Sequence, residues 1–132
     1  MEYDPNLVEG ARIAREWAYA PYSNFKVGAA LKTKSGKIFY GVNVENVSYG
    51  LTICAERSAA VTAVTAGERE WEEIAIVADT EKPITPCGAC RQFLAEFNPA
   101  LKVVVANTTK VHFTCTLTEL LPYAFNLETL ES

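Results

Sequence analysis

Three cysteines in two clusters are the residues of this sequence best suited to metal chemistry. Cys54 opens the run Cys54-Ala55-Glu56-Arg57, and Cys87 and Cys90 lie in the later run Pro86-Cys87-Gly88-Ala89-Cys90-Arg91. Three protein ligands with an open fourth position for water characterise a catalytic zinc site rather than a structural one. A Cys-x-x-Cys pair at the start of a helix lets two sulfurs face one metal. The spacing therefore predicts a catalytic zinc site held by Cys54, Cys87 and Cys90.

Glu56 and Arg57 follow Cys54 directly and could serve the same site. On the first turn of a helix, Glu56 can point into the pocket without ligating the metal, where a proton shuttle is needed. The alternative for Glu56 is an ordinary first-turn glutamate that the helix dipole favours. Three thiolates outweigh the charge of one zinc ion, so a nearby cation must balance them. We expect Arg57 to be this charge-balancing residue, with Arg91 as a second candidate.

Both cysteine clusters must be presented by the ends of secondary-structure elements. Residues 54–66 and 87–97 have helical composition, so each cluster begins a predicted helix, where the dipole and free N–H groups favour thiolates. Residues 5–20 also show apolar residues at helical spacing, and Thr118 is a candidate N-cap for a short last helix. Five strand-like runs complete the pattern: 27–33, 38–44, 74–78, 103–106 and 111–117.

The link between the last two strands restricts the topology. Residues 107–110 are too few for a parallel crossover, which needs a dozen or more residues, so the two strands should be antiparallel. In the last strand, alternation predicts Val111, Phe113 and Cys115 on one face and His112 on the opposite, solvent side. The expected fold is a three-layer α/β/α domain with a mixed five-stranded sheet.

Composition narrows the class of protein. The 132 residues suit one domain, 1–132, and the formal charge of −4 argues against a nucleic-acid partner held by phosphate contacts. No apolar run approaches the roughly 20 residues of a membrane-spanning helix, so no membrane partner is expected. The acidic start of the chain lacks the features of a signal peptide, which predicts a cytoplasmic location. In that reducing compartment, clustered cysteines favour metal binding or catalysis over disulfides.

The two clusters resemble the motifs of the zinc nucleoside and nucleotide deaminase superfamily, H-x-E…P-C-x-x-C or its three-cysteine variant. The resemblance extends over most of the chain. The segments A-Y-A-P-Y-S-N-F-K-V-G-A-A-L (18–31), G-V-N-V-E-N (41–46) and L-L-P-Y-A-F (120–125) are similar to the small homotetrameric cytidine deaminases.

This resemblance implies hydrolysis of cytidine and 2′-deoxycytidine to uridine and 2′-deoxyuridine, with release of ammonia, in pyrimidine salvage. It implies Zn²⁺ as cofactor and Glu56 as the residue that moves protons. It also implies a homotetramer with shared active sites. The substrate-binding residues implied by position are Asn43 and Glu45 for the ribose hydroxyls, Phe25 and the Ala55 N–H for the base, and Tyr49 and Phe125 for a neighbouring subunit's site.

Two positions depart from the family pattern, and several alternatives stay open. Tyr123 stands where the family often has glycine, and Val47 where it often has alanine. Cys115 could be the fourth ligand of a structural zinc site, although its place in an alternating strand favours a core residue. The rival functions are a deaminase of another aminated pyrimidine such as blasticidin S, a nucleic-acid editing deaminase, and a zinc-stabilised interaction module.

Overall fold

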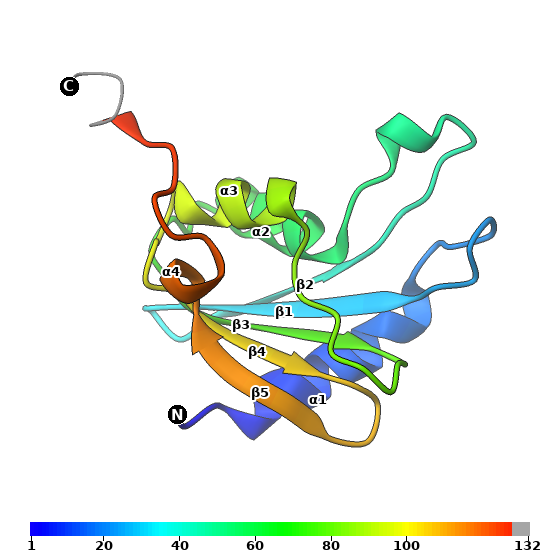
Figure 1. The fold of residues 1–132 in the computed structure, drawn as a ribbon, viewed down its shortest axis with the longest axis horizontal. Coiled ribbons are helices and arrows are strands. Elements are labelled where there is room, and N and C mark those ends of the chain that lie inside the picture. The colour runs from blue at the N-terminus through cyan, green and yellow to red at the C-terminus, as the bar shows by residue number, and fades with distance from the viewer. Residues whose placement is uncertain (128–132) are drawn as a thin grey trace.

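The computed structural model describes residues 1–127 of the chain, which fold around one five-stranded sheet (Figure 1). No helix in this described part is both long and apolar enough to cross a membrane. The α-helices are α1 (Pro5–Ala14), α2 (Ala55–Thr65), α3 (Gly88–Ala95) and α4 (Leu117–Leu120), with short 3-10 helices η1 (Arg15–Trp17) and η2 (Tyr49–Leu51). The strands are β1 (Val27–Thr33), β2 (Ile38–Val42), β3 (Trp71–Ala78), β4 (Lys102–Ala106) and β5 (Val111–Thr116).

The strand order β2-β1-β3-β4-β5 makes the sheet mixed, which confirms the expected sheet class. β1 pairs antiparallel with β2 and β3, whereas β3 and β4 are parallel. The crossover between these parallel strands contains α3. β4 and β5 pair antiparallel, as the short link between them requires.

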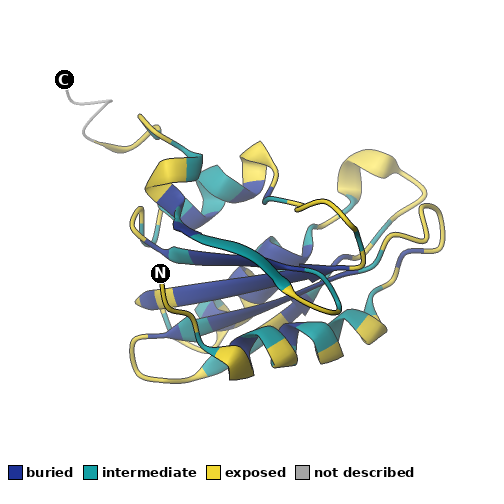
Figure 2. Ribbon diagram, turned by 60° about the horizontal axis from the view of Figure 1, so that its bottom comes forward, coloured by how far each residue is buried: buried dark blue, intermediate teal, exposed yellow. Residues whose placement is uncertain are grey.

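Strand alternation sends apolar side chains to both faces of the sheet, and helices cover each face (Figure 1). On one face α1 packs through Leu7 and Ala11 against residues that include Ala30 and Val104. The other face packs against α2 and α3 in a larger core. Figure 2 shows the central strands buried between helices whose outer surfaces are exposed. Trp71 is fully buried in this larger core and stacks on Phe97, with 4.1 Å between ring centroids.

The helix that follows Cys54 lies unusually close to β2. A Cβ built on Gly41 would lie 2.2 Å from the Ala59 N and 2.4 Å from the Ala55 O, so only glycine fits between the strand and α2. The face of α2 toward the sheet consists largely of alanines, which keeps the distance short. This contact fixes the start of α2, and with it Cys54 and Glu56, against the sheet.

The first helix is shorter than its sequence pattern predicts. α1 ends at Ala14 and tightens into the 3-10 turn η1, and Trp17 is 81% exposed rather than packed. The Arg15 Nε donates to the Lys26 O at 3.1 Å, which ties the end of the helix to the segment that enters β1. The prediction of a helix to residue 20 was therefore wrong, because contacts with a distant segment redirect the chain.

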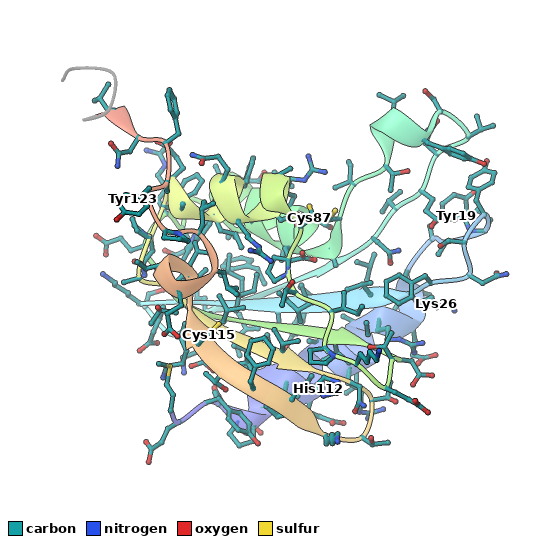
Figure 3. All side chains as sticks on the ribbon, viewed as in Figure 1. Tyr19, Lys26, Cys87, His112, Cys115 and Tyr123 are labelled. Carbon is teal, nitrogen blue, oxygen red and sulfur yellow. The ribbon has the colours of Figure 1, made fainter. Side chains whose placement is uncertain are left out.

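A β-bulge overturns the alternation predicted for the last strand. Val105 pairs with Phe113 but Ala106 pairs with Val111, so His112 is the extra residue. Val111 consequently packs on the α1 side, whereas Phe113 packs on the α2 side. His112, which is labelled on β5 in Figure 3, is half-buried rather than solvent-facing.

The last described α-helix begins earlier than expected. Thr116, not Thr118, caps α4, in a capping box with Glu119. The Thr118 hydroxyl donates instead to the Pro99 carbonyl at 2.7 Å.

Candidate active site

The three predicted metal ligands converge between the starts of α2 and α3. The Sγ atoms of Cys54, Cys87 and Cys90 all lie within 4.8 Å of one another, and those of Cys54 and Cys87 are 3.8 Å apart. A tetrahedral zinc with Zn–S bonds of about 2.3 Å has sulfur–sulfur edges of about 3.8 Å. Soft thiolates at this spacing fit Zn²⁺.

The local backbone explains why both clusters can bind a metal. Cys54 and Cys87 are the N-cap residues of α2 and α3, with extended backbone, and neither side chain caps its own helix. Their sulfurs are therefore free to point at a shared site, near the positive ends of two helix dipoles. Hydrogen bonding from Cys90 and then from Arg57 lowers the pKa of Cys54, although burial opposes the shift. A thiolate is thus favoured at this position.

Glu56 lies beside this site and is 5% exposed. Burial raises the pKa of its carboxyl above the ordinary value of 4.5, and the negative charge of Cys54 acts in the same direction. A raised pKa makes a carboxylate a stronger general base than an exposed one. This environment suits the predicted proton shuttle.

A cavity of about 360 Å³ opens beside Cys54 and Cys87, whereas the buried Cys90 lies behind them and does not line it. Its walls include six of the predicted site residues besides Cys87: Phe25, Asn43, Glu45, Cys54, Ala55 and Glu56. Its volume is typical of pockets for small organic ligands. Segments that lie far apart in the sequence thus meet around one hollow.

The polar wall of the cavity is held by hydrogen bonds to the segment that precedes β1. Asn43 donates through Nδ2 to the Phe25 O at 2.7 Å and accepts at Oδ1 from the Val27 N–H at 2.9 Å. Glu45 accepts at Oε1 from the N–H groups of Tyr22 and Ser23, at 2.9 and 3.1 Å. An amide and a carboxylate have more than these sites, so each side chain retains capacity for a ligand.

The two arginines next to the cysteines have different partners. The Arg57 Nη2 lies 3.9 Å from the Cys54 Sγ. Arg91 points elsewhere: it donates to the Pro86 O and the Leu120 O, both at 2.7 Å, and to the Thr85 Oγ1 at 2.9 Å. Arg57 is therefore the arginine in contact with a sulfur, and Arg91 fixes the turn before Cys87.

Sequence reasoning missed several residues of the cavity wall. Ser23, Thr52 and Thr85 add hydroxyl groups, and Ile76 and Ile84 add apolar surface. Ser23 and Thr85 each lie within two residues of a residue singled out from sequence, which was the available signal. Ile76 gave no such signal, because the sequence does not distinguish a buried strand residue that lines a cavity from one that packs in the core.

Two predicted substrate contacts lie outside this cavity. Tyr49 borders a neighbouring hollow with Tyr22, and the rings of these tyrosines are in edge contact, with centroids 6.2 Å apart. Phe125 is 58% exposed, and its carbonyl accepts a hydrogen bond from the Gln92 Nε2 at 2.8 Å. Within one copy of the described chain, neither aromatic ring lines the cavity beside Cys54 and Cys87.

The remaining residues noted in the sequence have clear places. Cys115 is 8% exposed in the core, apart from Cys87 in Figure 3, so it is not a fourth ligand. Tyr123 has φ 57° and a fully exposed side chain, and this left-handed conformation explains why glycine suits its position. Val47 is also exposed.

Comparisons with known proteins agree with this geometry. Residues 1–107 match the family described as "Cytidine and deoxycytidylate deaminase zinc-binding region". The chain is 52% identical over 123 residues to a cytidine deaminase of Halalkalibacterium halodurans, covering 92% of this chain and 93% of the relative. It is 38% identical over 130 residues to one of Mycobacterium tuberculosis, covering 98% and 95%.

A solved structure of a cytidine deaminase has the same fold as this chain. The 1.6 Å crystal structure of cytidine deaminase from Burkholderia pseudomallei superposes with a TM-score of 0.89 and 53% identity, over 94% of this chain and 100% of that one. The family match over residues 1–107 spans both cysteine clusters and strands β1 to β4. The chain therefore belongs to the cytidine and deoxycytidylate deaminase family.

Proposed function

We propose that this protein is a zinc-dependent cytidine deaminase that converts cytidine and 2′-deoxycytidine to uridine and 2′-deoxyuridine, releasing ammonia. The convergence of three cysteine sulfurs within 4.8 Å, beside the buried carboxyl of Glu56, carries the proposal. Relatives that match over more than nine-tenths of this chain are named cytidine deaminases, which supports the choice of substrate.

In the proposed reaction, Cys54, Cys87 and Cys90 hold Zn²⁺. When bound, the ion supplies a Lewis acid that makes water nucleophilic at neutral pH. Glu56 takes a proton from the attacking water and delivers it to N3 of the base. The water oxygen bonds to C4, and Glu56 then takes the remaining hydroxyl proton and gives it to the amino nitrogen. The C4–N bond breaks, ammonia leaves and the C4 carbonyl forms. The burial that raises the pKa of Glu56 makes its carboxylate a stronger base toward the proton of the attacking water.

The rest of the cavity orients the nucleoside. The Phe25 ring packs on the base, and the Ala55 N–H contacts the base near the reacting carbon. Asn43 and Glu45 bind the ribose hydroxyls through the donor and acceptor sites that the loop leaves free. Both line the same cavity as Glu56, which supports their assignment to one substrate. Arg57 balances the negative charge of the thiolates.

We further propose that residues 1–132 form one catalytic domain that assembles into a homotetramer with shared active sites. Tyr49 and Phe125 would then complete a neighbouring copy's site, and their exposure of 77% and 58% supports this role. A cytoplasmic location suits the chemistry, because zinc-binding cysteines must remain reduced. The proposed physiological role is pyrimidine salvage.

The decisive experiment measures zinc content and the decrease of cytidine absorbance on the same size-separated protein. We expect one zinc per chain and deamination of cytidine and 2′-deoxycytidine with higher kcat/KM than blasticidin S. Cys87→Ser should lose both zinc and activity, whereas Cys115→Ser should keep zinc. A zinc-loaded wild-type protein that leaves both nucleosides unchanged would refute the function.

The shared site has a separate test. An inactive Glu56→Gln chain and a Phe125→Ala chain, unfolded and refolded together, should regain activity that neither shows alone. Mixed assemblies without added activity would contradict the contribution of Phe125 to a neighbouring copy.

A further inference from the structure

A short segment before β1 contributes Ser23 and Phe25 to the wall of the cavity. Tyr22, Ser23 and Phe25 belong to this segment, and Asn24 between them has φ 57°, a left-handed conformation that asparagine tolerates. The segment contains no α-helix or β-strand, so its shape depends on the side chains that hydrogen-bond to it.

The hydroxyl group of Ser23 joins these side chains. It donates to the Glu45 Oε2 and accepts from the Phe25 N–H at 3.0 Å. On the other side of the same residue, the Phe25 O is held by the Asn43 Nδ2 at 2.7 Å. The Phe25 backbone is thus hydrogen-bonded at both its N–H and its carbonyl. The Ser23 hydroxyl that accepts from the N–H also donates to Glu45.

We propose that Ser23 is a positioning residue that couples the Glu45 carboxylate to the Phe25 backbone and so fixes the distance between the sugar-binding and base-binding walls. This inference rests on the proposed function for its link to substrate. The ligand class is a nucleoside with ribose hydroxyls, because the serine aligns a carboxylate with an aromatic ring across one cavity. Alanine can supply neither the donor nor the acceptor that this linkage uses.

The linkage acts on binding more than on the chemical step. Ser23 does not contact the sulfurs or Glu56 through any recorded hydrogen bond among the described residues, so the proton transfers stay intact. Loss of a preorganised contact to a charged group should raise KM for cytidine about fivefold to tenfold, with kcat within about twofold of wild type.

The kinetic test compares Ser23→Ala, Ser23→Thr and Glu45→Gln. Ser23→Thr keeps the hydroxyl and should restore KM, and the double variant Ser23→Ala/Glu45→Gln should lose less than the sum of the single losses. Ser35→Ala is the matched control, because Ser35 makes a similar hydrogen bond to Glu68, at 2.7 Å, in the β1–β2 turn. Its KM should stay unchanged.

A second readout does not depend on activity. The Ser23 hydroxyl is the largest cause that holds the pKa of Glu45 below its ordinary value, followed by burial, which opposes it, and the backbone N–H groups. An NMR titration of the Glu45 carboxyl should therefore show a higher pKa in Ser23→Ala than in wild type or Ser23→Thr.

The kinetic comparison and the Glu45 titration distinguish a failure of the Ser23 proposal from a failure of the proposed function. Unchanged KM and an unchanged Glu45 titration in Ser23→Ala would overturn the role of Ser23, even in a protein that deaminates cytidine rapidly. Equal losses of kcat and zinc would also overturn it, because they indicate general damage to the site. If wild type does not deaminate cytidine, the proposed function fails, and the titration alone decides whether Ser23 is coupled to Glu45.

Discussion

The guanidinium of Arg57 lies against the sulfur of Cys54, with 3.9 Å between Nη2 and Sγ. Its Nε is buried and has no hydrogen-bond partner among residues 1–127. A buried nitrogen without a partner costs free energy, so the side chain is not placed there for its hydrogen bonds alone. Its positive charge lies beside the cysteine cluster, which supports the proposed charge balance, and contact with Cys54 and Cys90 raises the pKa of Arg57.

Replacing Arg57 should therefore weaken the metal site. We expect Arg57→Gln to lower zinc affinity or kcat by roughly 10- to 100-fold, the usual effect of losing a residue that supports a metal ligand. Competition with a chromogenic chelator measures the affinity. Arg12→Gln is the control, because Arg12 pairs with Glu9 on the solvent side of α1, away from the cysteines. Wild-type zinc affinity and kcat in Arg57→Gln would argue against charge balance.

Removing the carboxyl of Glu56 should separate chemistry from metal binding. Glu56→Gln keeps the size of the side chain but cannot shuttle protons, so kcat should fall by at least about 10²–10⁴. Zinc content and circular dichroism should match wild type, because Glu56 is not a ligand. Glu16→Gln, on the exposed turn η1, is the control. Appreciable turnover by Glu56→Gln would assign the proton transfers to another group.

Arg91 should matter to the metal through the turn before Cys87. Arg91→Ala leaves the carbonyl groups of Pro86 and Leu120 without their donor, so zinc affinity should fall roughly tenfold. Gln92→Ala is the matched control on the same helix, since it releases only the Phe125 carbonyl. Equal zinc affinities in the two variants would mean that Arg91 does not support the site.

Gly41 should tolerate no side chain. The Cβ of Gly41→Ala would meet the backbone of α2 at 2.2 Å, so the helix must move away from the sheet. Such overpacking costs about 1–3 kcal/mol in the free energy of unfolding, and here it should also reduce kcat by displacing Glu56. Urea unfolding of Gly41→Ala and Gly50→Ala provides the comparison, because nothing lies near a Cβ at Gly50. Equal midpoints would exclude the close contact.

Asp4 should give the fold a pH-dependent contribution. It caps α1 by accepting from the Asn6 N–H at 2.9 Å, and the Lys32 Nζ lies 3.2 Å from its other oxygen. Burial raises the pKa of Asp4, but these hydrogen bonds outweigh it and lower the pKa below the ordinary 3.8. The stabilisation is thus complete above pH 3.8 and is lost as the pH falls through the lowered pKa.

Thermal unfolding checks this sign. At pH 7, Asp4→Ala should cost about 1 kcal/mol, the usual loss of an N-cap. Asp4→Asn keeps a capping oxygen and loses the ion pair, so its difference from wild type should vanish at acid pH. A difference that grows as the pH falls would contradict the assignment.

Much of the fold followed from local patterns. The strand Val27–Thr33 matched its expected bounds, because its apolar run and the turn that follows act over a few residues, whereas β2 ends at Val42 rather than at residue 44. The end of the first helix and the side of His112 were predicted wrongly, because neither a 3-10 turn nor a β-bulge changes the apolar pattern distinctly. Both irregularities depend on contacts with another segment.

The sequence by itself determined the chemistry that this protein can perform. Cys54 and Glu56 share one helix start, and Cys87 and Cys90 share another, so their residue types and helix positions are local properties. Only the tertiary structure decided which of these groups meet. The parallel crossover brings Cys87 within 3.8 Å of Cys54, and packing turns Arg91 toward Leu120 and Ser23 toward Glu45. The direction of each side chain depends on neighbours that are distant in sequence, because burial and hydrogen bonding are settled when the elements pack.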